Sequence, residues 1–176
     1  MTPQAPLQNS GAAPFVRPAT SADRDAIWQI IEPTFRAGET YAVARDISRE
    51  DALAFWFAPG HEVFAAEAEG QAEPLLGTYF LRPNHEGGGA HVANCGYVTA
   101  PAAYGRGVAR TMCAHSLRHA RSRGFRAMQF NFVVAANYRA VRLWQSLGFE
   151  IVGRLPGAFL HPTLGYVDAL VMYRDL

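Results

Sequence analysis

The chain has 176 residues, enough for one globular domain that buries its core without a metal or a disulfide. Its net charge is only +1 and its basic residues are scattered, so nucleic acid is not an expected partner. Every basic residue in that balance is arginine, which excludes a Schiff-base lysine and a Walker-type phosphate loop.

The start of the sequence predicts a leader and a single domain. Residues 1–13 are rich in proline, alanine and polar residues without periodicity, so we expect a disordered leader before a domain over residues 14–176. No apolar run approaches the ~18 residues of a membrane span, and no signal-peptide pattern precedes the domain. We therefore expect a soluble, cytoplasmic protein without a membrane partner. The two cysteines, Cys95 and Cys113, are expected to pack as small core side chains.

The first predicted elements are a strand and a helix. The strand covers residues 15–18. Thr20 followed by Asp23 is typical of a helix start, and apolar residues at helical spacing extend that helix through Phe35.

A second helix start, Ser48 with Asp51, predicts a short helix over residues 52–57. Alternating apolar residues then predict two strands, over residues 61–67 and 75–81.

The second half alternates strands and helices. We expect a strand over residues 90–100, a helix over 106–123, a strand over 127–134 and a helix over 137–147. His115 and His119 stand four apart on one of these helices, but nothing nearby supplies a third ligand, so a solvated face and no metal site are expected.

The last predicted strands cover residues 149–154 and 166–173 and flank a loop over residues 156–165. The second half of the chain thus has the order strand–helix–strand–helix–strand. This order predicts a mixed sheet with a parallel pair at its centre. The fold class is therefore α/β (α+β), with about seven strands and four helices.

The glycine turn between residues 100 and 108 is the most informative segment. Gly105 and Gly107 follow a strand and open a helix, so main-chain N–H groups and the helix dipole can bind an anion such as a pyrophosphate. A plain strand-to-helix turn is the simpler interpretation. A dinucleotide-binding fold needs a further glycine where Arg110 stands and an acidic residue near Arg126, and both are missing.

Two motifs in this half of the chain share the features of one family. They read Pro101-x-x-x-Gly105-x-Gly107-Val108-Ala109 and Asn137-x-x-Ala140-Val141-x-Leu143-Trp144-x-x-Leu147-Gly148-Phe149. The first resembles the acetyl-CoA loop of the GCN5-related N-acetyltransferases (GNAT superfamily), and the second is similar to that family's second signature. The resemblance covers about residues 15–176 and implies the GNAT fold, with a splayed central parallel pair.

The resemblance implies acetyl-CoA as cosubstrate and assigns residues to it. Main-chain groups of Tyr97, Val98 and Thr99 would bind the pantetheine, and Asn137 would reach the cofactor arm near the sulfur. Asn137 fits a helix N-cap equally well. The pyrophosphate would be held by Gly105, Arg106, Gly107, Val108, Ala109 and Arg110.

The implied reaction is direct attack of an amine on the thioester, and the chain departs from the family in groups that move protons. Trp144 stands where the family often has a tyrosine that protonates the leaving thiolate, which indole cannot do. Tyr138 is an alternative donor, although packing also fits it. Asn131, Asn137 and Tyr138 are thus the candidate catalytic residues. The strand over 90–100 has no carboxylate, leaving as candidate bases Glu39, His85 and His91, or a water.

Three asparagines suggest the acceptor. The spacing of Asn94, Asn131 and Asn137, together with Gly165-Tyr166-Val167-Asp168-Ala169 near the C-terminus, resembles that of the fungal N-acetyltransferases of proline analogues such as azetidine-2-carboxylate. Asn131 could equally be a satisfied structural amide. The resemblance implies a small amino or imino acid, with Asn94 and Asn131 as substrate ligands. A second wall would be formed by Phe35, Glu39, Thr40 and Tyr41. A phosphinothricin-type enzyme and a catalytically silent CoA-binding sensor are alternatives, and a homodimer is expected.

Overall fold

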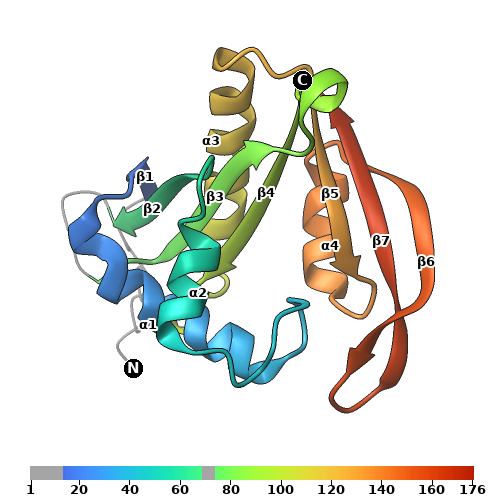
Figure 1. Ribbon diagram of the computed structural model, residues 1–176, viewed down its shortest axis with the longest axis horizontal. Coiled ribbons are helices and arrows are strands. Elements are labelled where there is room, and N and C mark those ends of the chain that lie inside the picture. The colour runs from blue at the N-terminus through green and yellow to red at the C-terminus, as the bar shows by residue number, and fades with distance from the viewer. Residues whose placement is uncertain (1–13, 69–73) are drawn as a thin grey trace, which may run out of the picture.

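The computed structural model describes residues 14–68 and 74–176 (Figure 1). The expected leader, residues 1–13, lies outside the described residues. The strands are β1 (Pro14–Pro18), β2 (Glu62–Ala68), β3 (Gly77–Pro83), β4 (Val92–Thr99), β5 (Ala127–Val134), β6 (Glu150–His161) and β7 (Gly165–Asp175). The α-helices are α1 (Arg24–Ala37), α2 (Arg49–Trp56), α3 (Val108–Ser122) and α4 (Tyr138–Ser146). Short 3₁₀ turns are η1 (Ser21–Asp23), η2 (Gly87–Gly89) and η3 (Pro101–Ala103).

The helix starts follow the capping signals in the sequence. The Asp23 carboxylate accepts the Thr20 N–H at 2.6 Å, and the Ser48 hydroxyl accepts the Asp51 N–H at 3.0 Å. Each contact satisfies an N–H group that a helix start leaves without a partner. The Arg17 guanidinium holds the Asp23 carboxylate through two hydrogen bonds of 2.9 Å, which also ties β1 to the first helix.

One seven-stranded sheet has the order β1-β2-β3-β4-β5-β7-β6. All neighbouring strands are antiparallel except the central pair, β4 and β5. The predicted fold class is confirmed: a mixed sheet with four helices and a central parallel pair. In the described residues, no helix is long and apolar enough to cross a membrane.

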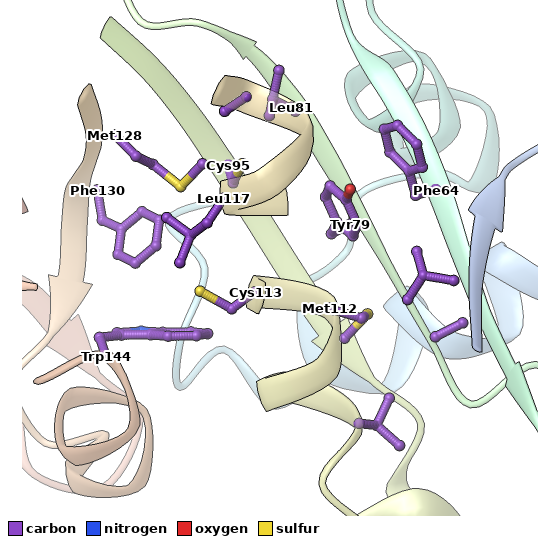
Figure 2. Close-up of a cluster of buried hydrophobic side chains, with 14 of the residues drawn as sticks. Phe64, Tyr79, Leu81, Cys95, Met112, Cys113, Leu117, Met128, Phe130 and Trp144 are labelled. Atoms are coloured by element: carbon purple, nitrogen blue, oxygen red, sulfur yellow. The ribbon is translucent and has the colours of Figure 1, made fainter. Parts of the chain in front are cut away.

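The helices cover the two faces of the sheet and produce two hydrophobic clusters. Side chains from α3 and α4 pack on one face with Cys95, Cys113, Met128 and Trp144 (Figure 2). Side chains from α1 and α2 pack on the other face, against Val98 among others. Both cysteines are free and buried, as predicted.

The central strands separate soon after they meet. Backbone pairing joins Val92 to Ala127 and Ala93 to Met128, and then ends. At the next residue, the Asn94 side-chain amide donates to the Gln129 carbonyl at 2.9 Å, so a side chain spans the gap where the backbones diverge. The sheet therefore opens between β4 and β5, as Figure 1 shows.

The C-terminal hairpin differs from the prediction. The expected loop over residues 156–165 was wrong, because β6 continues to His161 before the chain turns into β7. The register shifts between Leu155 and Phe159, so a bulge accommodates Pro156-Gly157. The Asp168 carboxylate accepts the Gly157 N–H at 2.8 Å and replaces the missing ladder contact.

Candidate active site

A cavity of about 510 Å³ lies where β4 and β5 separate. The connection between α1 and α2 borders it through Thr40 and Tyr41, and the start of α4 borders it through Asn137 and Ala140. Elements from both faces of the sheet thus border the cavity.

On the β4 wall, two side chains from other elements come very close to the backbone of Gly96. A Cβ atom there would lie 2.6 Å from the Phe80 ring and 2.9 Å from the Tyr41 hydroxyl. The Tyr41 hydroxyl donates to the Tyr97 carbonyl at 3.1 Å, and burial raises the pKa of Tyr41 far above its usual range. Tyr41 is therefore a fixed neutral donor at this wall.

The residues expected to form the second wall lie in three different environments. Tyr41 lines the cavity. Glu39 lines a smaller neighbouring cavity of about 320 Å³, together with Tyr138 and Asn137. Phe35 does not reach either surface: it is fully buried, with its ring centroid 5.3 Å from that of Tyr41, so its predicted contact with substrate is wrong and it supports Tyr41 from behind.

The β5 wall carries Asn131 in a bulge, since the register between β5 and β7 shifts between Phe130 and Val133. Gln129 Nε2 donates to Asn131 Oδ1 at 2.8 Å, and Asn131 Nδ2 donates to Asn84 Oδ1 at 2.7 Å. The bulge turns the Asn131 amide to the cavity while these neighbours fix its orientation. Asn131 is thus both a bonded structural amide and a lining residue. Asn94, which also lines the cavity, is buried and holds the strand junction.

The start of α4 supplies the third wall. Asn137 Oδ1 accepts the Ala140 N–H at 3.2 Å, so Asn137 caps the helix and also lines both cavities. The two interpretations of Asn137 are therefore compatible. Trp144 packs its ring 5.2 Å from those of Tyr97 and Phe130 and lines the larger cavity. Tyr138 is exposed and contacts the smaller cavity alone.

The glycine turn faces outward. Gly105 and Gly107 have φ angles of +77° and +78°, and no atom lies within 4 Å of a Cβ atom added at either position. The first backbone bond of α3 runs from Thr111 to the Gly107 carbonyl. Within the described chain, the N–H groups of Gly107, Val108 and Ala109 therefore have no acceptor, and the α3 dipole adds partial positive charge there.

Two arginines and the free edge of β4 lie next to this turn in the chain. The Arg106 side chain is exposed, and the Arg110 guanidinium donates to the Ser146 hydroxyl at 2.8 Å, which connects α3 to α4. Tyr97, Val98 and Thr99 pair with β3 on one side only, because β5 has already diverged. The open edge of β4 and the free amides of α3 fit the pantetheine and the diphosphate of a coenzyme A ester.

Two cavity-lining side chains that can carry a charge, His61 and Arg82, were not predicted from the sequence. His61 Nδ1 donates to the Trp56 carbonyl at 3.0 Å, and its ring stacks on Phe80 with centroids 4.3 Å apart. Burial lowers the pKa of His61, and the Arg82 charge lowers it further. Neither residue belongs to a local motif, because they approach each other only through the pairing of β2 with β3. The expected base candidates His85 and His91 are exposed and do not line either cavity.

The histidine pair on α3 was also predicted incorrectly. His115 Nδ1 shares a hydrogen bond of 2.7 Å with the Tyr79 hydroxyl, and His119 Nε2 lies 2.8 Å from a Glu62 carboxylate oxygen. Both rings pack on Phe64, so they are half-buried rather than solvated. The described residues contain no group of histidine, cysteine, aspartate and glutamate side chains that could hold a metal ion.

The fold, the cavity between β4 and β5 and the free amides at the start of α3 together define an acyltransferase that uses a coenzyme A thioester. Residues 24–149 match the family model described as the acetyltransferase (GNAT) family. N-acetyltransferase aca1 of Schizosaccharomyces pombe is 29% identical over 149 residues, which cover 76% of this chain and 71% of that protein.

Solved structures of acetyltransferases are similar to this chain. A GCN5-related N-acetyltransferase from Kribbella flavida is similar with a TM-score of 0.86 and 43% identity, over 93% of this chain and 98% of that one. A phosphinothricin acetyltransferase from Sinorhizobium meliloti, in complex with AcCoA, shares the fold with a TM-score of 0.80 and 19% identity, over 93% of this chain and 89% of that one.

Because the family model matches well over half of its length, the chain belongs to the GNAT acetyltransferase family. It is an acetyl-CoA-dependent N-acetyltransferase, with acetyl-CoA as its cosubstrate, as the sequence predicted. The Schizosaccharomyces pombe relative also agrees with the predicted resemblance to fungal N-acetyltransferases.

Proposed function

We propose that the acceptor is the amine of a small amino or imino acid, such as a proline analogue. The observation that supports this most directly is the charge of the cavity. Among the described residues, its lining includes one arginine, Arg82, and the amides Asn94, Asn131 and Asn137, with no aspartate or glutamate. A polyamine or aminoglycoside needs acidic partners, whereas a carboxylate needs an arginine or amide donors.

Arg82 is the proposed partner of the substrate carboxylate. It lies opposite Asn94 in the pairing of β3 with β4, so the two side chains share one face of the sheet. Arg82 forms no ion pair with any other described residue. Its guanidinium and the Asn131 amide can therefore hold a carboxylate from two sides and leave the amine between β4 and β5.

The proposed cosubstrate site lies along β4 and the start of α3. Main-chain groups of Tyr97, Val98 and Thr99 bind the pantetheine, and Asn137 contacts the arm near the sulfur. The diphosphate lies on the amides of Gly105 to Arg110. Bound acetyl-CoA supplies an acetyl thioester, whose carbonyl can be polarised by a main-chain N–H of β4.

The proposed reaction is direct attack of the amine on the thioester carbonyl. Burial raises the pKa of Cys113 to about 12 and the pKa of Cys95 beyond that, so neither thiol is a nucleophile. Positioning of the two reactants then provides much of the rate enhancement. Asn131 and Asn137 orient the reactants, and Tyr138 or solvent protonates the thiolate.

The test is release of free thiol from acetyl-CoA across a panel of amino acids, imino acids, their methyl esters and polyamines. We expect turnover with carboxylate-bearing amines and at least about a 100-fold loss of kcat/KM with the esters. Arg82→Met should raise KM for the acid about 100-fold and leave the ester unaffected. Arg121→Met, on the exposed side of α3, is the matched control. Turnover of polyamines in preference to acids would overturn the proposal.

The same assay separates the alternatives. A phosphinothricin-type enzyme would prefer phosphinothricin to proline analogues at equal concentration. A silent CoA-binding sensor would bind CoA in calorimetry and release no thiol with any acceptor. Trp144, which replaces a phenol donor, supports this second alternative, and turnover of any single amine excludes it.

We also propose a cytoplasmic homodimer. Use of acetyl-CoA and two free buried thiols support the compartment. The exposed apolar side chains of the C-terminal hairpin support the dimer; they are Ile151, Val152, Leu155, Leu160, Leu164 and Tyr166.

A further inference from the structure

We infer that His61 is the general base that takes a proton from the substrate ammonium. This inference rests on the proposed function, because it assumes an amine acceptor in the cavity between β4 and β5. It supplies the base that is absent from β4, whose cavity-lining residues, Asn94, Cys95, Gly96 and Tyr97, include no carboxylate and no imidazole.

The geometry leaves one nitrogen of His61 free. Because a carbonyl only accepts, the contact of 3.0 Å to the Trp56 carbonyl keeps the proton on Nδ1. Nε2 therefore carries the lone pair of the neutral ring, and in the described chain it has no hydrogen-bond partner. The backbone N–H of His61 also donates to the Ala58 carbonyl, at 2.9 Å, so the main chain at His61 is held in place as well.

His61 lines the cavity in which the acceptor is proposed to bind. Its ring stacks on the Phe80 ring, and that same Phe80 ring closes over Gly96 on β4. One aromatic ring thus separates the imidazole from the β4 backbone. Because His61 and Asn94 line the same cavity, an amine bound there can pass a proton to Nε2 through water.

The charges around His61 favour the neutral base at physiological pH. From β3, Arg82 is the charged group that faces it, and α2 contributes the Trp56 carbonyl. The next residue, Glu62, begins β2 and is engaged by His119 on α3 and by Arg123 just after that helix. Burial and Arg82 lower the pKa of His61, and although the bond to the Trp56 carbonyl raises it, the net shift is downward, which favours the neutral ring when an ammonium arrives.

The proton balance is complete with these groups. The ammonium gives one proton to Nε2 and becomes a neutral amine. The amine lone pair forms the N–C bond, the C–S bond breaks, and its electron pair leaves on sulfur. The second nitrogen proton passes through water to the thiolate, and His61 returns its proton to solvent. The net products are the amide, free CoA thiol and one proton.

His61→Asn is the discriminating variant, because the Asn amide can still donate to the Trp56 carbonyl while Nε2 is removed. We expect kcat/KM at pH 7 to fall about 100-fold. The deficit should shrink to less than about 5-fold above about pH 9, where more of the substrate amine is already neutral. Imidazole should partly restore His61→Gly. His85→Asn, on an exposed loop, is the matched control.

The outcomes separate this inference from the proposed function. No turnover by the wild-type enzyme with any amino or imino acid would defeat the proposed function itself. Normal wild-type turnover with an unchanged pH profile in His61→Asn would overturn only the role of His61. An equal loss at every pH, with no rescue of His61→Gly, would assign His61 a structural role instead.

Discussion

A single glycine determines the shape of the acceptor side of the cavity. Gly96 has no Cβ, which allows Phe80 and Tyr41 to approach the β4 backbone. In Gly96→Ala, the new methyl group must displace the Tyr41 hydroxyl from the Tyr97 carbonyl or move Phe80. We expect kcat/KM to fall about 10-fold or more, and the free energy of unfolding to fall by about 1–3 kcal/mol.

The measurements for Gly96→Ala are steady-state kinetics and urea denaturation. The matched control is Gly88→Ala, since Gly88 has no atom within 4 Å of an added Cβ and no left-handed φ. If both variants kept wild-type kinetics, the close packing over Gly96 would have no part in the activity.

At the scale of elements, the start of α3 should determine coenzyme affinity. Gly107 has a left-handed φ of +78°, and the free amides follow it. Gly107→Ala strains that turn by about 1–2 kcal/mol and shifts the amides, so we expect the Kd for CoA in calorimetry to rise about 10-fold.

Gly124→Ala separates strain from binding in that experiment. Gly124 has a φ of +86° at the opposite end of α3, so it loses similar stability. Its CoA affinity should stay within about 2-fold of the wild type. A similar loss of affinity in both variants would contradict a diphosphate site at the glycine turn.

The elements were largely predictable from the sequence, whereas the cavity lining was only partly so. Capping residues such as Ser48 and the glycines of the α3 turn act locally, and their elements formed where expected. Phe35 was misassigned because a helix pattern does not say which apolar residue a sheet will cover. His61 was missed because its role depends on a neighbouring strand. The β6 extension was missed because a bulge can accommodate a proline that usually ends a strand.

At the scale of the whole molecule, stability should fall in mild acid. Burial lowers the pKa of His115, as do Arg118 and His119, and burial also lowers the pKa of His61. A folded pKa below the unfolded value means that the unfolded chain binds more protons, so the free energy of unfolding falls as pH decreases through about 6.5.

His115→Asn tests this pH dependence because it removes a titrating group and keeps an acceptor for the Tyr79 hydroxyl. We expect the decrease in Tm between about pH 7 and pH 5.5 to be roughly 2 °C smaller than in the wild type. His85→Asn, an exposed histidine, should leave that decrease unchanged. An unchanged pH dependence in His115→Asn would show that His115 does not contribute.

The two edge strands of the sheet, β1 and β6, differ in their expected part in dimer formation. β6 is the outermost strand on one side, and its hairpin carries Leu160 and Leu164, which are 64% and 61% exposed. A stable dimer buries about 800 Å² on each partner, and apolar side chains along an unpaired strand favour such burial. Light scattering should therefore give a mass twice the 19.3 kDa of the chain.

Charge at that edge should dissociate the dimer. In the double variant Leu160→Arg with Leu164→Arg, we expect a monomer at micromolar concentration, because an arginine at an apolar interface is buried without a partner. Phe15→Arg introduces the same charge at an exposed residue of β1, the opposite edge of the sheet, and should remain dimeric. A wild-type chain that scatters as a monomer at all concentrations would contradict the homodimer, and dissociation by Phe15→Arg instead would move the interface to β1.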